Sequence, residues 1–280
     1  MAQVTKAPSN MLSRMEAAFF DLDKTIIARS GPIALSRSFL REGLIARSTL
    51  LKSMYAQLVF QLMGADDKKM ERLRAEAAKL TSGWEADKVR SVVAEVLEEV
   101  ISPWIYAEAL ELIHDHRRAG RLICIVSSSP EEIVEPLARM LRVDRWIATR
   151  PKVVDGIYSG DLEFYAYGPY KVQAMNELAE ELDIDLDRSF AYSDSITDLP
   201  MLESVGHPIA INPDRELRKV AAERNWAVEF FRHPVPMRDR LPQLRRPEVT
   251  VTNGLAAAGA VAFVAALAWW LAKRNAERVE

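Results

Sequence analysis

Two pairs of aspartates are the residues best suited to chemistry. Asp21 and Asp23 lie in the segment Asp-Leu-Asp-Lys-Thr, and Asp194 and Asp198 lie in Ser-Asp-Ser-Ile-Thr-Asp. Neighbouring carboxylates repel one another unless a cation or a shared proton stabilises them. An acidic turn would explain either pair alone. If all four carboxylates converge, they require a hard divalent cation, and oxygen ligands of this kind favour Mg²⁺.

Three serines and a lysine supply groups that bind phosphate. Ser127, Ser128 and Ser129 follow an apolar run and precede Pro130, and Lys171 stands at the start of a predicted helix. Hydroxyls and backbone N–H groups at a strand-to-helix junction bind phosphate oxygens, and an ammonium group neutralises a phosphoryl charge. Taken singly, the serines are explained equally by a turn with a helix cap, and the lysine by solvent exposure.

Short apolar runs must position these groups. Runs of this length without alternation are typical of strands buried on both faces of a parallel sheet, and helical patterns such as 131–141 and 171–182 lie between them. The pattern predicts an α/β fold, with helices on both faces of a Rossmann-like sheet whose carboxyl edge carries the polar groups. The predicted strands are Ala17–Phe20, Leu122–Val126, Phe190–Tyr192, Pro208–Ile211 and Trp226–Phe231.

The interval between the first two predicted strands is far too long for a crossover. About a dozen residues suffice for a parallel connection, whereas this interval contains four helical patterns, 32–44, 48–63, 66–80 and 84–101. We therefore predict an inserted all-helical cap domain at 30–104, within a core formed by 15–29 and 105–231. A smaller insertion spans Val153–Leu162, where Asp155-Gly156 is typical of a hairpin turn.

The overall composition excludes several other classes of protein. The net charge of −3 argues against a nucleic-acid binder. A single cysteine, Cys124, excludes an internal disulfide framework and a Cys-rich zinc site, and its apolar run predicts a buried thiol. His114 and His116 are two residues apart on a predicted helix, so they do not share a face as zinc ligands would, and we expect them at the surface.

The C-terminal part of the chain differs from the rest. Residues 232–248 are rich in proline and arginine, which predicts a semi-extended linker. Residues 249–272 carry no charge, and their last 18 residues would form a helix of about 27 Å, near the thickness of a bilayer core. Because Trp269, Trp270, Lys273 and Arg274 suit an interface, we predict a transmembrane helix. A helix packed against protein or lying along the membrane is the alternative.

In motif order, residues 15–231 resemble the haloacid dehalogenase (HAD) superfamily phosphatases, in the subfamily IB branch similar to phosphoserine phosphatases. The first motif, DxDxT, corresponds to Asp21, Asp23 and Thr25, and the second-motif serine to Ser127. The third-motif lysine corresponds to Lys171, and the fourth-motif acids to Asp194 and Asp198. The resemblance implies the HAD fold with a helical cap inserted after the first motif, and it does not extend to the C-terminal tail.

The resemblance also implies a mechanism. Asp21 would attack phosphorus and form an aspartyl-phosphate, and Asp23 would protonate the leaving alcohol and later activate water. Mg²⁺ would be held by Asp21, the backbone carbonyl of Asp23 and Asp194, with Asp198 in support. The phosphoryl oxygens would be bound by the Ser127 hydroxyl, the Ser128 N–H and Lys171, while Thr25 would shape the loop.

One departure from the family pattern concerns the substrate. Phosphoserine phosphatases carry a glutamate nine residues after the nucleophile, where it meets the substrate's ammonium group, and this chain has Ser30 there. We therefore expect a Mg²⁺-dependent phosphomonoesterase for another small-molecule or lipid-related phosphate ester. The alternatives are phosphoserine phosphatase proper and a non-catalytic membrane-linked module, against which the presence of Asp23 argues. The lack of an N-terminal signal and the apolar tail predict a single-pass anchor with the enzyme on the cytoplasmic face.

Overall fold

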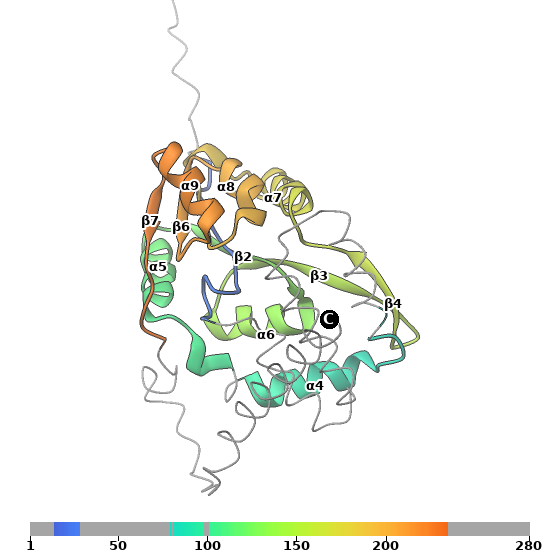
Figure 1. The fold of residues 1–280 in the computed structure, drawn as a ribbon. Coiled ribbons are helices and arrows are strands. Elements are labelled where there is room, and N and C mark those ends of the chain that lie inside the picture. The colour runs from blue at the N-terminus through green and yellow to red at the C-terminus, as the bar shows by residue number, and fades with distance from the viewer. Residues whose placement is uncertain (1–13, 29–78, 80, 98–100, 235–280) are drawn as a thin grey trace, which may run out of the picture. The chain divides into compact units, whose positions relative to one another are not determined.

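The computed structural model describes residues 14–28, 79, 81–97 and 101–234. This part of the chain forms an α/β fold around one sheet with the strand order β4-β3-β2-β1-β5-β6-β7 (Figure 1). All neighbouring strands are parallel except β3 and β4. The strands are β1 (Ala17–Phe20), β2 (Leu122–Pro130), β3 (Arg145–Val154), β4 (Ile157–Phe164), β5 (Phe190–Ser193), β6 (His207–Ile211) and β7 (Ala227–Glu229).

The sheet lies between two layers of helices because its central strands are apolar on both faces. In β1, Ala18 and Phe20 pack into one core with residues of α4, α5 and α6, and Ala17 and Phe19 pack into a second core with residues of α7, α8 and α9. Cys124 is buried on β2, as predicted. The helices are α4 (Ala86–Val96), α5 (Ala107–Arg118), α6 (Glu131–Leu141), α7 (Pro169–Leu182), α8 (Leu199–Glu203) and α9 (Arg215–Glu223), with short 3₁₀ helices η2 (Ser102–Trp104), η3 (Leu186–Arg188) and η4 (Ile196–Asp198).

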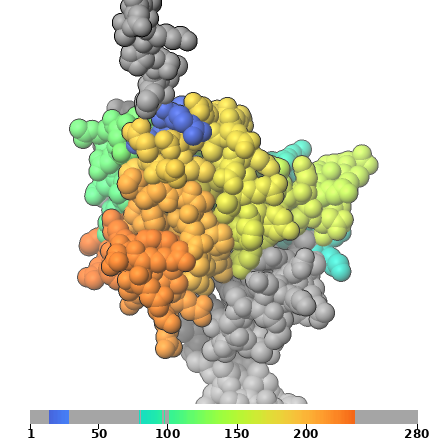
Figure 2. Space-filling view, turned by 90° about the horizontal axis from the view of Figure 1, so that it is seen from above, coloured from blue at the N-terminus to red at the C-terminus, as the bar shows by residue number. Residues whose placement is uncertain are grey.

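The predicted hairpin is present, but it is longer than the sequence pattern indicates. Strands β3 and β4 are joined at Asp155 and Gly156, both of which have the positive φ that a tight hairpin turn requires. The first half of β3 also pairs with β2 in the main sheet, a strand that we did not predict. Figure 2 shows the hairpin projecting beside the face formed by α7, α8 and α9.

Two predictions about burial are wrong. Strand β7 forms, but it is an edge strand whose three residues are all exposed, because only β6 pairs with it in the described sheet. His116 is buried on α5, although His114 is exposed as expected. The imidazole of His116 packs against the rings of Phe190 and Tyr192, and its Nε2 lies 2.7 Å from the Tyr192 hydroxyl.

The segments on either side of the predicted cap are paired with each other. The Tyr106 N–H donates to the Ile26 carbonyl, and the Ala28 N–H donates to the Trp104 carbonyl. Residues 231–234, which we call the C-terminal strap, run past the same place. Pro234 is paired with Tyr106 there.

Hydrogen bonds hold the C-terminal strap at both of its ends. The backbone of Phe231 exchanges two hydrogen bonds with the Asn212 side chain. The His233 imidazole meets the Glu108 carboxylate at 2.7 Å, so the strap joins the end of β6 to the start of α5.

The described residues leave out most of the predicted cap, including Ser30, and the linker beyond residue 234. The apolar run 249–272 also lies outside them. Helix α4 is the described part of the fourth predicted cap helix. Among the residues that the structure describes, no helix is both long and apolar enough to cross a membrane.

Candidate active site

The predicted site residues meet at the carboxyl edge of the sheet. Asp21 directly follows β1, Asp194 directly follows β5, and Ser127 lies near the end of β2. The chain passes from β1 to β2 and β3 on one side, and later from β5 to β6 and β7 on the other. The strand order therefore reverses beside β1, which is where open α/β sheets bind ligands.

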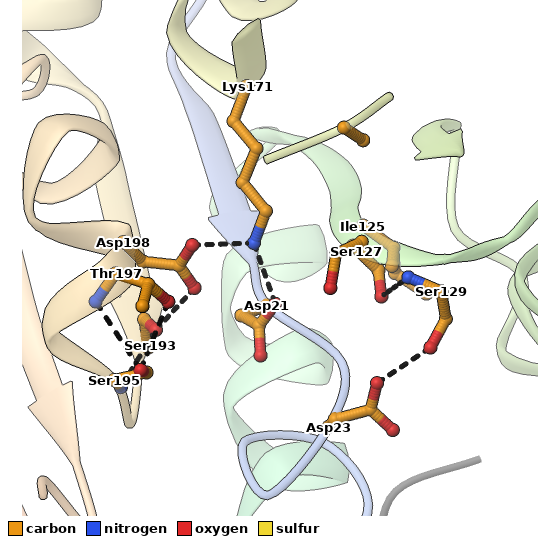
Figure 3. A network of polar contacts seen from close by, with 12 residues as sticks. Asp21, Asp23, Ile125, Ser127, Ser129, Lys171, Ser193, Ser195, Thr197 and Asp198 are labelled. Atoms are coloured by element: carbon orange, nitrogen blue, oxygen red, sulfur yellow. Dashed lines mark hydrogen bonds and ion pairs between the residues drawn. The ribbon is translucent and has the colours of Figure 1, made fainter. Parts of the chain in front are cut away.

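Lys171 connects the first and fourth motifs. It lies at the first turn of α7 and is 2 % exposed. Its Nζ atom donates to Asp21 Oδ1 at 2.9 Å and to Asp198 Oδ1 at 2.7 Å, as Figure 3 shows. An ammonium group has three donors, so two carboxylates leave one N–H for a third acceptor.

The charges in this network are strongly coupled. Burial raises the pKa of Asp21 well above its ordinary value; the Lys171 ammonium opposes this rise, and the carboxylates of Asp198, Asp194 and Asp23 add to it. Burial works against the charge on Lys171, but the carboxylates of Asp198 and Asp21 raise its pKa above the usual value. The single buried ammonium group of Lys171 is therefore surrounded by carboxylates whose combined negative charge exceeds its own positive charge.

Asp198 is held by the Ser193 hydroxyl as well as by Lys171. Ser193 Oγ donates to Asp198 Oδ2 at 2.7 Å, and the N–H of Ser195 donates to Ser193 Oγ at 3.3 Å. Ser195 caps η4 by accepting from the N–H of Thr197. With both of its oxygens engaged and 4 % exposure, Asp198 orients Lys171.

Asp194 is a second buried carboxylate, and its charge is only partly compensated. Burial raises its pKa to about 7; the Lys24 ammonium lowers it, and nearby Asp198, Asp214 and Asp23 raise it further. The Lys24 Nζ atom is 3.6 Å from Asp194 Oδ2, but its side chain is 63 % exposed. A buried carboxylate in this condition fits a cation-binding site.

The donor set also fits Mg²⁺ in its chemistry. No cluster of three or more acidic, histidine or cysteine side chains is gathered for a metal within the described ranges. The expected set needs only two carboxylates, from Asp21 and Asp194, because the Asp23 contribution is a backbone carbonyl. Hard oxygen donors of this kind, completed by water and phosphate oxygens, suit Mg²⁺.

The serines form a compact turn at the end of β2. The N–H of Ser129 donates to Ser127 Oγ at 3.1 Å, and Thr149 Oγ1 donates to the Ser128 carbonyl at 2.8 Å. Ser127 is completely buried, whereas Ser128 is exposed. Ser129 Oγ donates to Asp23 Oδ2 at 2.7 Å, which joins the second motif to the first (Figure 3).

The structure brings Asp21, Lys171 and Asp198 into direct contact. It places Ser127 near the end of β2 and Asp23 and Asp194 on loops at the same edge of the sheet. Thr25 is fully buried on the same loop as Asp21, and its hydroxyl has no hydrogen-bond partner within the described part of the chain. Sequence reasoning named Ser129 as a phosphate-binding candidate, not as a partner of Asp23. It missed the other residues that orient the predicted groups. Lys24 and Ser193 are polar neighbours of motif residues, whereas Thr149 and Asp214 have no local signal in the sequence.

Comparisons with known proteins show which family this chain resembles. Residues 18–203 match the haloacid dehalogenase-like hydrolase family. The chain is 48 % identical to an "inhibition of morphological differentiation protein" of Streptomyces azureus, covering 93 % of this chain and 94 % of the relative. It is also 48 % identical to a probable phosphatase of Mycobacterium tuberculosis, with 88 % of both chains covered.

The chain is also similar to a named phosphatase and to a solved structure. A phosphoserine phosphatase of Mycobacterium tuberculosis is 33 % identical, over 77 % of this chain and 71 % of the relative. A solved structure of a protein of unknown function from Bordetella pertussis superposes with a TM-score of 0.68 and 26 % identity, covering 78 % of this chain and 99 % of the other.

Proposed function

The chain belongs to the haloacid dehalogenase-like hydrolases, and on that premise we propose that it is a Mg²⁺-dependent phosphomonoester hydrolase in which Asp21 is the nucleophile. The observation that carries the proposal is the buried Lys171, which donates to both Asp21 and Asp198. A buried lysine between two carboxylates at the carboxyl edge is suited to hold a phosphoryl group in front of Asp21.

The reaction proceeds in two steps. A carboxylate oxygen of Asp21 forms a bond to phosphorus while the bond from phosphorus to the ester oxygen breaks, and the leaving oxygen takes a proton from Asp23. Water then attacks phosphorus and gives a proton to the Asp23 carboxylate, and the bond between phosphorus and the Asp21 oxygen breaks. Phosphate leaves, and both aspartates return to their starting forms.

The rest of the site binds the transferring group. The remaining N–H of Lys171, the Ser127 hydroxyl and the Ser128 N–H would contact phosphoryl oxygens, which is mostly electrostatic stabilisation. Asp21, the Asp23 carbonyl and Asp194 would hold Mg²⁺, with Asp198 in support. When bound, the ion neutralises phosphate charge and keeps Asp21 ionised.

The substrate we favour is a small-molecule or lipid-related phosphate ester. Ser30 lacks the carboxylate that would pair with an ammonium group. The alternative is phosphoserine itself, which is supported by the 33 % identity to a phosphoserine phosphatase. The charge-free run 249–272 supports attachment to the cytoplasmic face of a membrane by a single span, where a lipid phosphate would be within reach.

Phosphate release from a panel of phosphate esters tests the proposal. We expect wild-type activity to disappear in EDTA and to return with Mg²⁺. Asp21→Asn should abolish turnover while the circular dichroism spectrum and the melting temperature stay near those of wild type, because the amide is nearly isosteric but a poor nucleophile. Release by Asp21→Asn within tenfold of wild type, or full activity in a metal-free preparation, would contradict the mechanism.

A further inference from the structure

The hydrogen bond between Ser129 and Asp23 joins two residues that are 106 positions apart in the sequence. Ser129 Oγ lies 2.7 Å from Asp23 Oδ2, and the Ser129 side chain is buried at 4 % exposure. A short bond to a carboxylate from a buried hydroxyl is stronger than a neutral one. Figure 3 shows this contact on the opposite side of Asp21 from Asp198.

Ser129 does not have the structural role that its position before a helix suggests. Pro130, not Ser129, is the N-cap of α6, and no side chain caps that helix. The Ser129 hydroxyl instead points toward Asp23 of the first motif. The Ser129 backbone is fixed in place because its N–H donates to Ser127 Oγ. Thr149 fixes the adjoining peptide by donating to the Ser128 carbonyl, and it accepts from the N–H of Ala166.

We infer that Ser129 is a positioning residue for Asp23, the group that exchanges protons with the leaving alcohol and with water. This inference rests on the proposed function. With Oδ2 engaged by Ser129, rotation of the Asp23 carboxyl group is restricted. A serine hydroxyl can donate to a carboxylate and accept from a carboxylic acid. Ser129 can therefore hold Asp23 in both of its protonation states without gaining or losing a proton.

The size of the effect follows from what a general acid contributes. Proton transfer by a positioned side chain accelerates a reaction by about 10²–10⁴-fold. Ser129→Ala leaves Asp23 in place but removes this restraint on its carboxyl group, so the variant should lose part of that factor, about 10- to 100-fold. The loss should fall on substrates whose leaving oxygen needs the proton. An alkyl phosphate needs it, whereas 4-nitrophenyl phosphate releases a weakly basic phenolate without it.

The test compares kcat/KM for these two kinds of ester within each variant. The alkyl ester is phosphoserine or glycerol phosphate, whichever the wild type hydrolyses faster. Because kcat/KM covers the steps up to departure of the leaving group, Ser129→Ala should lower it about 10- to 100-fold for the alkyl ester and less than about threefold for 4-nitrophenyl phosphate. A ratio measured on one sample does not depend on the fraction of folded protein, so poor folding cannot imitate the result.

Three further variants complete the experiment. Ser189→Ala removes another buried hydroxyl, which accepts from Ala17 and donates to Asp185 far from the catalytic edge, and it should leave the ratio unchanged. Ser129→Thr keeps a hydroxyl and should restore the ratio. In an Asp23→Asn background, Ser129→Ala should have no further effect on the ratio, since residues that act as a unit are non-additive.

The outcomes separate this inference from the proposed function. If wild type is active but Ser129→Ala slows both esters equally, the Ser129 hydroxyl has a general structural role and the inference is wrong. The same holds if the two substitutions add in the Asp23→Asn background. A wild-type enzyme that hydrolyses neither ester overturns the proposed function, and the inference with it.

Discussion

Replacing Lys171 with methionine removes an ammonium group that lies within 3 Å of two buried carboxylates. The Lys171 side chain is 3 % exposed, and its partners Asp21 and Asp198 are 9 % and 5 % exposed. Methionine fills a similar volume, so the change is chiefly electrostatic. Removing one partner of a buried ion pair costs about 3–5 kcal/mol because the remaining charge is left uncompensated.

The free energy of unfolding should therefore fall by about 3–5 kcal/mol at neutral pH in the absence of metal. Burial raises the pKa of Asp21, and without Lys171 that pKa rises further, so the folded variant binds a proton more readily than its unfolded form. The difference in the free energy of unfolding between the variant and the wild type should therefore become smaller as the pH is lowered. Mg²⁺ should also narrow it, since the ion supplies positive charge at the same carboxylates.

Urea denaturation of both proteins, with and without EDTA, measures these differences. Lys219→Met is a matched control, because the Lys219 side chain is 78 % exposed and pairs with Glu223 on its own helix; its effect should be within about 0.5 kcal/mol. A fall of less than about 1 kcal/mol in the free energy of unfolding of Lys171→Met at neutral pH would contradict this reasoning. So would a fall that grows as the pH is lowered. In either case Lys171 does not stabilise the fold by neutralising Asp21 and Asp198.

Three other predictions concern separate parts of the chain. Ser30→Glu should raise kcat/KM for phosphoserine by roughly tenfold or more, because a lost charged partner costs about 1.5–3 kcal/mol; a wild type that already prefers phosphoserine tenfold would contradict this. The full chain should sediment with membranes and resist carbonate washing, whereas a chain truncated after Arg246 should remain in the supernatant and active; equal distribution of both would refute the anchor. Burial lowers the pKa of His116 to about 4, so the unfolded chain takes up the proton first, and stability should decline by up to about 3 kcal/mol as the pH falls from about 6.5 to about 4. His116→Gln should reduce this fall in stability when urea denaturation is measured across the same pH range. An unchanged dependence of stability on pH would contradict the role given to His116.

The sequence was most informative where one physical requirement dominates. The run Ala17–Phe20 is apolar throughout because β1 is buried on both faces, and its predicted bounds are confirmed. The bounds of α6 are confirmed as well. The apolar runs also predicted that the motif residues lie at the carboxyl edge of the sheet. Parallel strands place the residues that follow them at the same edge.

Other features depend on contacts between distant parts of the chain, which no local sequence pattern predicts. Strand β3 escaped prediction because Arg145 and Arg150 flank its short apolar stretch, and its partner changes from β2 to β4 along its length. Strand β7 lies in the mostly apolar run Trp226–Phe231, but it is at the edge of the sheet and contains Glu229. The contact between Ser129 and Asp23 depends on an irregularity of β2 between Ser127 and Pro130, which spacing alone does not reveal.

The C-terminal strap has a practical consequence for anyone handling the protein. The strap follows β7 and runs to the start of α5. Strand β7 is parallel to its neighbour, and Pro234 follows it, so the chain leaves the core at the edge that carries Asp21 and Lys171. Residue 14, just before β1, lies at the other edge. An affinity tag, dye or surface tether fused directly behind Pro234 would therefore begin on the side of the sheet that carries the catalytic residues, whereas the same attachment before Arg14 would begin at the opposite edge.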